Sequence, residues 1–75
     1  MAGLVNRVRA GRKLPSPAMQ REIRKAAGVS QAQVAAELGV QRVTVARWET
    51  GLRKPSPRLL ERYVELLEQL REAVS

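Results

Sequence analysis

The sequence predicts an all-α fold, a small domain of about four helices whose last helix is long. Three observations predict it. Between Ser30 and Gly51, apolar residues recur at helical spacing in two runs, and a glycine follows each run. Ser-Pro pairs at 16–17 and 56–57 each place a capping residue before a proline, which is typical of a helix start. After Pro57, no Gly or Pro interrupts the chain up to Ser75.

A length of 75 residues allows one hydrophobic core and therefore a single domain. We expect this domain over residues 16–75 and a flexible basic arm over residues 1–15. The formal net charge is +7, with +6 on residues 1–28, +2 on residues 29–55 and −1 on residues 56–75. Such an excess favours a polyanionic partner, either nucleic acid or an acidic membrane. No stretch has the length of a membrane span or the pattern of a secretion signal, so we expect a cytoplasmic protein, bacterial or phage-encoded and associated with the nucleoid.

The arm, Met1 to Leu14, is expected to be mostly disordered when free, because Gly3 and Gly11 closely bracket its few apolar residues. Two interpretations remain open. The arm is either a solvated tail, or a segment that follows the phosphate backbone or enters a minor groove. Its candidate DNA contacts are Arg7, Arg9, Arg12 and Lys13.

The first helix of the domain is expected to begin after the Ser16 cap and to run to Ala27, with Gly28 as its stop. Its inner face is predicted from the apolar positions Met19, Ile23, Ala26 and Ala27. A second helix begins at Ser30, where Gln33 three residues later completes a capping box. Val34, Ala35 and Leu38 give this helix an apolar face, and Gly39 ends it.

The third helix is expected from about Gln41 to Gly51, and its two faces differ in character. Val45 and Trp48 point inward, so Trp48 is interpreted as a core residue and not as a platform for stacked bases. At 100° per residue, the opposite face spans an arc of roughly 140°. That arc contains Arg42, Val43, Ala46 and Arg47. Arginine can bond two acceptors on a guanine edge and valine can touch a thymine methyl, so these four are the candidate base-reading residues.

The stretch from Ser30 to Gly51 resembles the helix-turn-helix of the phage repressor and Cro family, also called the XRE family. The matching residues are Gln31, Ala35, Gly39, Val45, Trp48, Glu49 and Gly51, followed by the basic turn Leu52–Pro55. The resemblance is specific over Gly28–Pro57 and looser over Ser16–Ala27. It implies a lambda-repressor-like fold, binding to double-stranded DNA and a regulatory role.

The family resemblance also assigns roles around the reading face. It implies that Gln31 bonds a phosphate and that Arg53 and Lys54 lie against the DNA backbone. Gln41 is a poor N-cap, so its amide is expected to face the backbone too, and Thr44 lies at the edge of the reading arc. These five residues are the candidate phosphate contacts. The resemblance further implies a structural ion pair between Arg24 and Glu49.

Little in the sequence indicates an enzyme. There is no Cys and no His, which excludes disulfides, thiolate metal sites and imidazole acid–base chemistry. Four of the seven carboxylates lie on the last helix among arginines, as solvated pairs do, and the serines look like helix caps. We therefore expect no catalytic residues, no metal and no cofactor.

The last helix is expected from Pro57 to about Ala73, where family members usually have two short helices. One set of apolar residues follows alternating spacings of three and four, as a coiled-coil seam does. The set is Leu60, Tyr63, Leu67, Leu70 and Val74. We therefore predict a homodimer through this helix, which would select an inverted repeat; the competing view is that the face folds back onto the domain of a monomer.

Two other function classes stay open beside a sequence-specific transcriptional regulator of the repressor or Cro type. An antitoxin-like protein would bind operator DNA and hold a protein partner on its long helix. A recombination or architectural accessory factor would bend its DNA.

Overall fold

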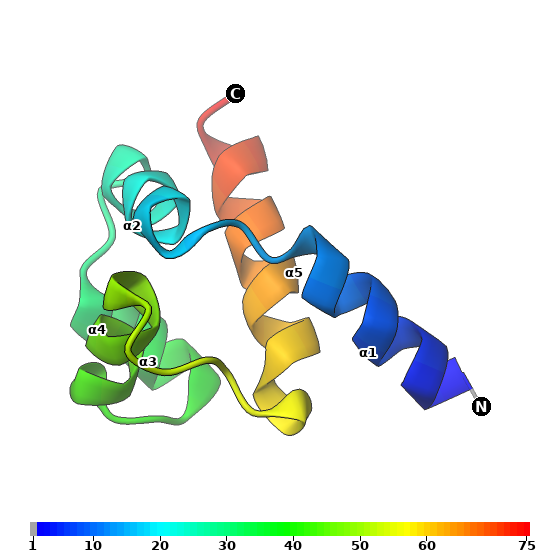
Figure 1. Cartoon of the computed structure of the whole chain (residues 1–75). Coiled ribbons are helices and arrows are strands. Elements are labelled where there is room, and N and C mark those ends of the chain that lie inside the picture. Colours follow the sequence, from blue (N-terminus) through cyan, green and yellow to red (C-terminus); the bar gives the residue numbers. More distant parts are fainter. Residues whose placement is uncertain (1) are drawn as a thin grey trace.

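The computed structural model describes residues 2–75, and within them it leaves the side chains of Ala2 and Arg7 undescribed. The described chain forms five α-helices and no strand (Figure 1). The helices are α1 (Ala2–Lys13), α2 (Pro17–Ala26), α3 (Gln31–Leu38), α4 (Arg42–Thr50) and α5 (Pro57–Ala73). The predicted all-α class, the helix-turn-helix and the long last helix are confirmed. The fifth helix, α1, lies where an arm without regular structure was expected.

Helices α3 and α4 form the predicted helix-turn-helix, and local interactions define their ends. The Ser30 hydroxyl accepts from the Gln33 N–H at 3.0 Å, and the Gln33 side chain accepts from the Ser30 N–H at 2.8 Å, which completes the capping box. Gly39 ends α3 at φ 73° and Gly51 ends α4 at φ 79°. In this left-handed region a side chain is strained, so both helices stop where glycine stands.

Helix α2 follows its predicted bounds, but it turns a different face inward. The Ser16 hydroxyl caps it by accepting from the Met19 N–H at 3.2 Å. Ile23 is buried as predicted, whereas Met19 is 44% exposed, so the prediction of Met19 as a core residue was wrong. Gln20 takes the inner position because both ends of its amide find partners there. It donates to the Pro15 carbonyl at 2.9 Å and accepts from the Tyr63 hydroxyl at 3.0 Å.

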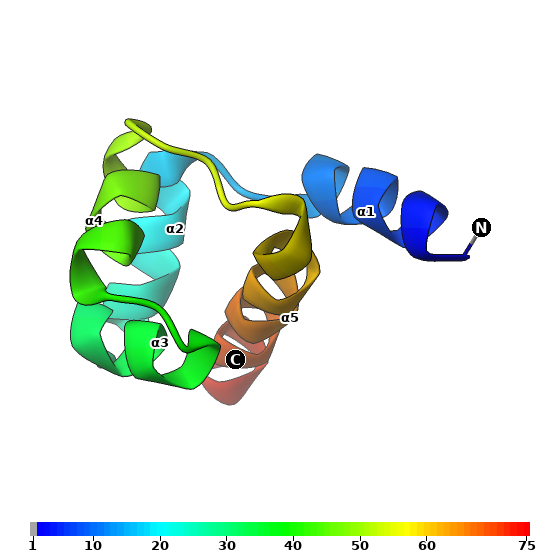
Figure 2. The ribbon, with the colours of Figure 1, turned by 90° about the horizontal axis from the view of Figure 1, so that it is seen from below.

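Helix α5 crosses the middle of the molecule, with α2, α3 and α4 on one side and α1 on the other (Figures 1 and 2). Tyr63 and Leu67 enter the core, where the Tyr63 ring lies 4.7 Å from the Trp48 ring, centroid to centroid. The predicted seam is therefore contradicted at Tyr63 and Leu67, which pack into the core of one chain, whereas the homodimer itself stays a prediction. Leu60 and Leu70 are half-buried, and of the five seam residues only Val74 is exposed.

Helix α1 packs on the outer side of α5 through its smallest residues. Ala10 is 6% exposed, and Val64 of α5 is 5% exposed. A Cβ atom on Gly11 would lie 3.8 Å from Leu60 Cδ2, so α1 approaches α5 closely at this point. Leu4, Val5 and Val8 instead face outward and are at least 45% exposed. The apolar surface of α5 that we assigned to a second copy is thus partly covered by α1 of the same chain.

Replacing Gly11 by alanine tests whether α1 is folded on α5 in the free protein. The added methyl group finds ordinary contact at Leu60, and alanine is a better helix former than glycine. We expect Gly11→Ala to raise the free energy of unfolding by roughly 0.5–1 kcal/mol, measured by urea denaturation.

The contrasting variant is Gly28→Ala, which places a side chain at φ 70° and should destabilise the protein. If Gly11→Ala leaves the urea midpoint unchanged while Gly28→Ala lowers it, α1 does not contribute to the folded state.

Candidate nucleic-acid interface

The face of α4 that points away from the core carries the residues predicted to read bases. Val45 and Trp48 are 0% and 3% exposed, which fixes the rotation of α4. Arg42 and Arg47 are exposed on the other side, with Val43 at 37% exposure and Ala46 half-buried beside them. The structure therefore brings two arginines together with an exposed valine and a small alanine on one helix face. That combination matches the chemistry of a base edge in the major groove.

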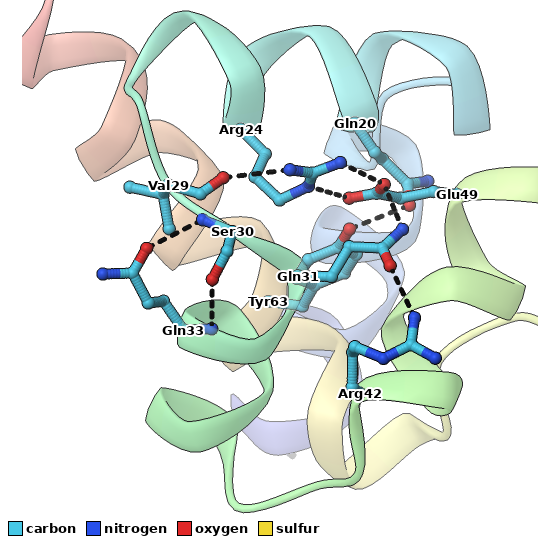
Figure 3. Close-up of polar contacts among 9 residues, drawn as sticks. All are labelled: Gln20, Arg24, Val29, Ser30, Gln31, Gln33, Arg42, Glu49 and Tyr63. Atoms are coloured by element: carbon cyan, nitrogen blue, oxygen red, sulfur yellow. Dashed lines mark hydrogen bonds and ion pairs between the residues drawn. The ribbon is translucent and has the colours of Figure 1, made fainter.

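Behind this face, the carboxylate of Glu49 joins three helices (Figure 3). Arg24 of α2 donates from Nε to Glu49 Oε2 at 2.7 Å and from Nη2 to Glu49 Oε1 at 3.0 Å. Gln31 of α3 donates from Nε2 to Glu49 Oε1 at 3.0 Å. The pair between Arg24 and Glu49 that the family resemblance implied is therefore present and bidentate, a geometry that adds both energy and orientation.

The same network extends outward to the reading face through Gln31. The Gln31 Oε1 atom accepts from Arg42 Nη1 at 3.1 Å, as Figure 3 shows. Gln31 therefore links the buried Glu49 to the exposed Arg42. Each side chain keeps donors for an outside partner, because Gln31 Nε2 has a second hydrogen and Arg42 has four further N–H groups.

The pKa of Glu49 is lowered by its surroundings. Burial by itself would raise it, but the hydrogen bonds from Arg24 and Gln31, together with the charges of Arg24 and Arg21, outweigh that effect. The carboxylate is thus ionised and held in place at neutral pH. For Tyr63 the balance is the reverse, since burial and the charge of Glu49 raise the pKa of its hydroxyl above the ordinary value.

A surface groove of about 520 Å³ connects the reading face with α2 and α3. Arg21 of α2 lines it beside Arg42 and Gln31, and Arg21 is exposed. The sequence analysis did not assign Arg21 to the interface. Its position three residues before Arg24 places it on the same side of α2, which could have identified it once Arg24 was paired with Glu49.

The basic turn after α4 adds cations at the end of the reading helix. The Arg53 N–H donates to the Arg47 carbonyl at 3.2 Å, so the turn folds back on the last residues of α4. Arg53 and Lys54 are exposed. Gln41, at the other end, is exposed and makes no side-chain capping bond, and Thr44 is half-buried. These predicted phosphate contacts thus lie at both ends of α4.

The structure places two of the four predicted arm contacts away from this face. Arg9 and Lys13 line a depression on the outer side of α5 with Glu61, Glu65 and Glu68. Figures 1 and 2 both show α1 on the side of α5 away from α4. Arg12 is exposed on α1, and the side chain of Arg7 lies outside the described residues.

Comparison with known proteins identifies the class. A family model described as "Helix-turn-helix" matches residues 20–72, which span all of α3 and α4 and most of α2 and α5. The chain therefore belongs to the helix-turn-helix family of the repressor and Cro (XRE) type, whose domains bind DNA and are typically not enzymes. No curated protein and no solved structure gave a match. Among residues 2–75, no helix is long and apolar enough to cross a membrane.

The network around Glu49 makes a prediction about stability and pH. Removing one partner of a buried pair strands the other, so we expect Glu49→Gln to destabilise the domain strongly, by an amount approaching roughly 3–5 kcal/mol. Glu65→Gln is the matched control and should change stability little, because Glu65 is exposed and forms no salt bridge with the described residues. Thermal melts at neutral pH compare the two variants.

The pKa of Glu49 is lowered on folding, so its contribution is present above the unfolded-state value of about 4.3 and is lost as the pH falls through the folded-state value. The stability difference between wild type and Glu49→Gln should therefore shrink as the pH falls below about 4. A difference that stays constant down to acidic pH would show that the Glu49 charge does not stabilise the fold.

Proposed function

We propose that this protein is a sequence-specific transcriptional regulator that reads the major groove of double-stranded DNA with α4. One observation carries the proposal, namely the opposite burial of the two faces of that helix. Val45 and Trp48 are fixed in the core, so Arg42, Val43 and Arg47 are held outward on a helix whose rotation is set. The family supports DNA binding, and the arginine-rich outer face supports base readout.

Phosphate contacts in this proposal flank the reading helix on two sides. Arg53 and Lys54 hold the backbone beyond the end of α4, and Gln31, Gln41 and Arg21 hold it beside the start of α4. Thr44, half-buried at the edge of the arc, adds a hydroxyl donor. Phosphate contacts of this kind fix register and orientation and carry no sequence information themselves.

The structure supports the two alternative classes less well than it supports a transcriptional regulator. An antitoxin-like role would use α5 as a free partner-binding helix, but α5 is covered on one side by the core and on the other by α1. An accessory factor that bends DNA would show its activity in a circular-permutation gel shift. We therefore place transcriptional regulation first.

The length of the DNA footprint will show how many copies of the protein bind one site. Tyr63 and Leu67 are buried in one chain, so we infer no pairing through the α5 seam. A footprint of one half-site would show a monomer. A footprint of two half-sites about one helical turn apart, roughly 34 Å, would show two copies arranged by a different surface.

Substitution of Arg47 and of Lys54 should separate base reading from phosphate binding. We expect Arg47→Ala to cost about 1–3 kcal/mol at one base position and to relax the preference there, because the lost contact is to a base edge. Lys54→Ala should weaken all sequences alike and reduce the slope of log affinity against log salt by about one unit. Selection from a randomised duplex library, followed by salt titration, measures both effects.

The matched control is Arg71→Ala, which removes one exposed cation at the far end of α5. It should change neither the selected motif nor the salt slope by a comparable amount. If Arg47→Ala selects the same motif as the wild type, Arg47 does not read a base and the assignment of the reading face fails.

A further inference from the structure

A cleft of about 400 Å³ opens behind the end of α4, and every described helix except α3 contributes to its border. The connection between α1 and α2 supplies Leu14 and Pro15, and the turn between α4 and α5 supplies Pro55. Trp48 and Leu60 complete its apolar lining. We call this the Trp48 cleft. Its volume lies in the range of small-molecule sites.

Two cations border the same cleft. Arg53 and Lys54 line it, and both are exposed. Neither takes part in a salt bridge with the described residues. The Trp48 cleft therefore combines an apolar wall with unpaired positive charge at its edge. The groove beside α4 also has exposed cations, Arg21 and Arg42, but alanines are the only apolar residues that line it.

The helix ends around the cleft indicate where a charge would sit. Helices α1 and α4 both end beside it, just before Leu14 and Gly51, and helix C-termini leave carbonyl groups that disfavour an anion. Helices α2 and α5 begin with prolines, which have no N–H to donate. Gln20 also lines the cleft, but its amide is already bonded to Pro15 and Tyr63. An anionic group is therefore held by Arg53 and Lys54, and the inner cleft accepts an apolar group.

We propose that the Trp48 cleft binds a small amphipathic anion, an aromatic ring system that carries one carboxylate or sulfonate. The ring lies against Leu14, Leu60 and the prolines, and it reaches only the small part of Trp48 that is exposed. The acidic group pairs with Arg53 and Lys54. Because the proposed function uses the same two cations on DNA phosphates, the ligand and duplex DNA compete for them, and the ligand acts as a releasing effector. This last consequence rests on the proposed function, whereas the binding itself does not.

Binding is tested on the full chain without DNA, with 1-anilinonaphthalene-8-sulfonate as the probe and its neutral relative N-phenyl-1-naphthylamine beside it. Trp48 is the only tryptophan, so its fluorescence reports the cleft directly. We expect saturable quenching by the sulfonate and at least tenfold weaker binding of the neutral relative. Arg53→Gln/Lys54→Gln should weaken sulfonate binding at least tenfold, because it removes both cations and leaves the apolar wall.

The matched control, Lys25→Gln/Arg71→Gln, makes the same change in net charge on exposed residues outside the cleft and should stay within twofold of wild type. Amide chemical shifts in the presence of the probe should change at residues 11–20 and 51–60. Equal affinity of the wild type and Arg53→Gln/Lys54→Gln, or shift changes centred on the groove between Met19 and Val74, would overturn the site.

Competition is tested separately by adding duplex DNA to the probe complex. We expect duplexes of any sequence to displace the sulfonate, with a dependence on salt, because the shared residues contact phosphates. If the two double variants bind the probe as expected but DNA binds without displacing it, the cleft binds a ligand that does not release DNA. If no duplex binds at all, the proposed function fails, and the fluorescence and shift data still decide the ligand site.

Discussion

The carboxylate of Glu49 is the constraint on which the arrangement of the reading face depends. Glu49 is 6% exposed, so its charge is costly unless the site satisfies it. Arg24 offers two parallel N–H groups from α2, and Gln31 offers one from α3. Arg24 also donates from Nη1 to the Val29 carbonyl at 2.9 Å, which holds the connection between α2 and α3. One buried charge thereby fixes the mutual positions of three helices. Through Gln31, it also orients the Arg42 side chain in the protein without DNA.

A second polar chain ties α5 to this assembly. The Tyr63 hydroxyl donates to Gln20, and Gln20 donates to the Pro15 carbonyl, so α5, α2 and the connection from α1 share one line of hydrogen bonds. Burying these groups is favourable only because each donor finds an acceptor, and no described buried side-chain polar atom lacks a partner. The Tyr63 ring also packs on Trp48, at an interplanar angle of 43°. The long last helix is therefore anchored to the rear of α4.

The helix bounds and the outward face of α4 could be predicted because local rules determine them. Ser16, Ser30, Gly39 and Gly51 act within three or four residues of their own positions, and the faces of α4 follow from its period alone. The inward side of α2 could not be predicted in this way. Hydrophobic periodicity places Met19 in the core before Gln20, but the hydrogen bond from Tyr63, which is distant in sequence, favours burial of Gln20. The same holds for α1. Ala10 is buried and Gly11 lies close to Leu60 because α1 packs on α5, which no local pattern encodes.

The packing of α1 on α5 also divides the charge of the molecule. Four glutamates, at positions 61, 65, 68 and 72, fall within an arc of roughly 60° on α5. Arg9 and Lys13 share a depression with three of them, so much of the positive charge of the N-terminal segment faces the negative charge of α5. On the α4 side, by contrast, Arg53 and Lys54 border a cleft that no acidic residue lines. At physiological salt, charges beyond about 8 Å are largely screened, so the local sign matters more than the net charge of +7. The α4 side is therefore the one that favours a polyanion, although four cations, Arg7, Arg9, Arg12 and Lys13, belong to α1.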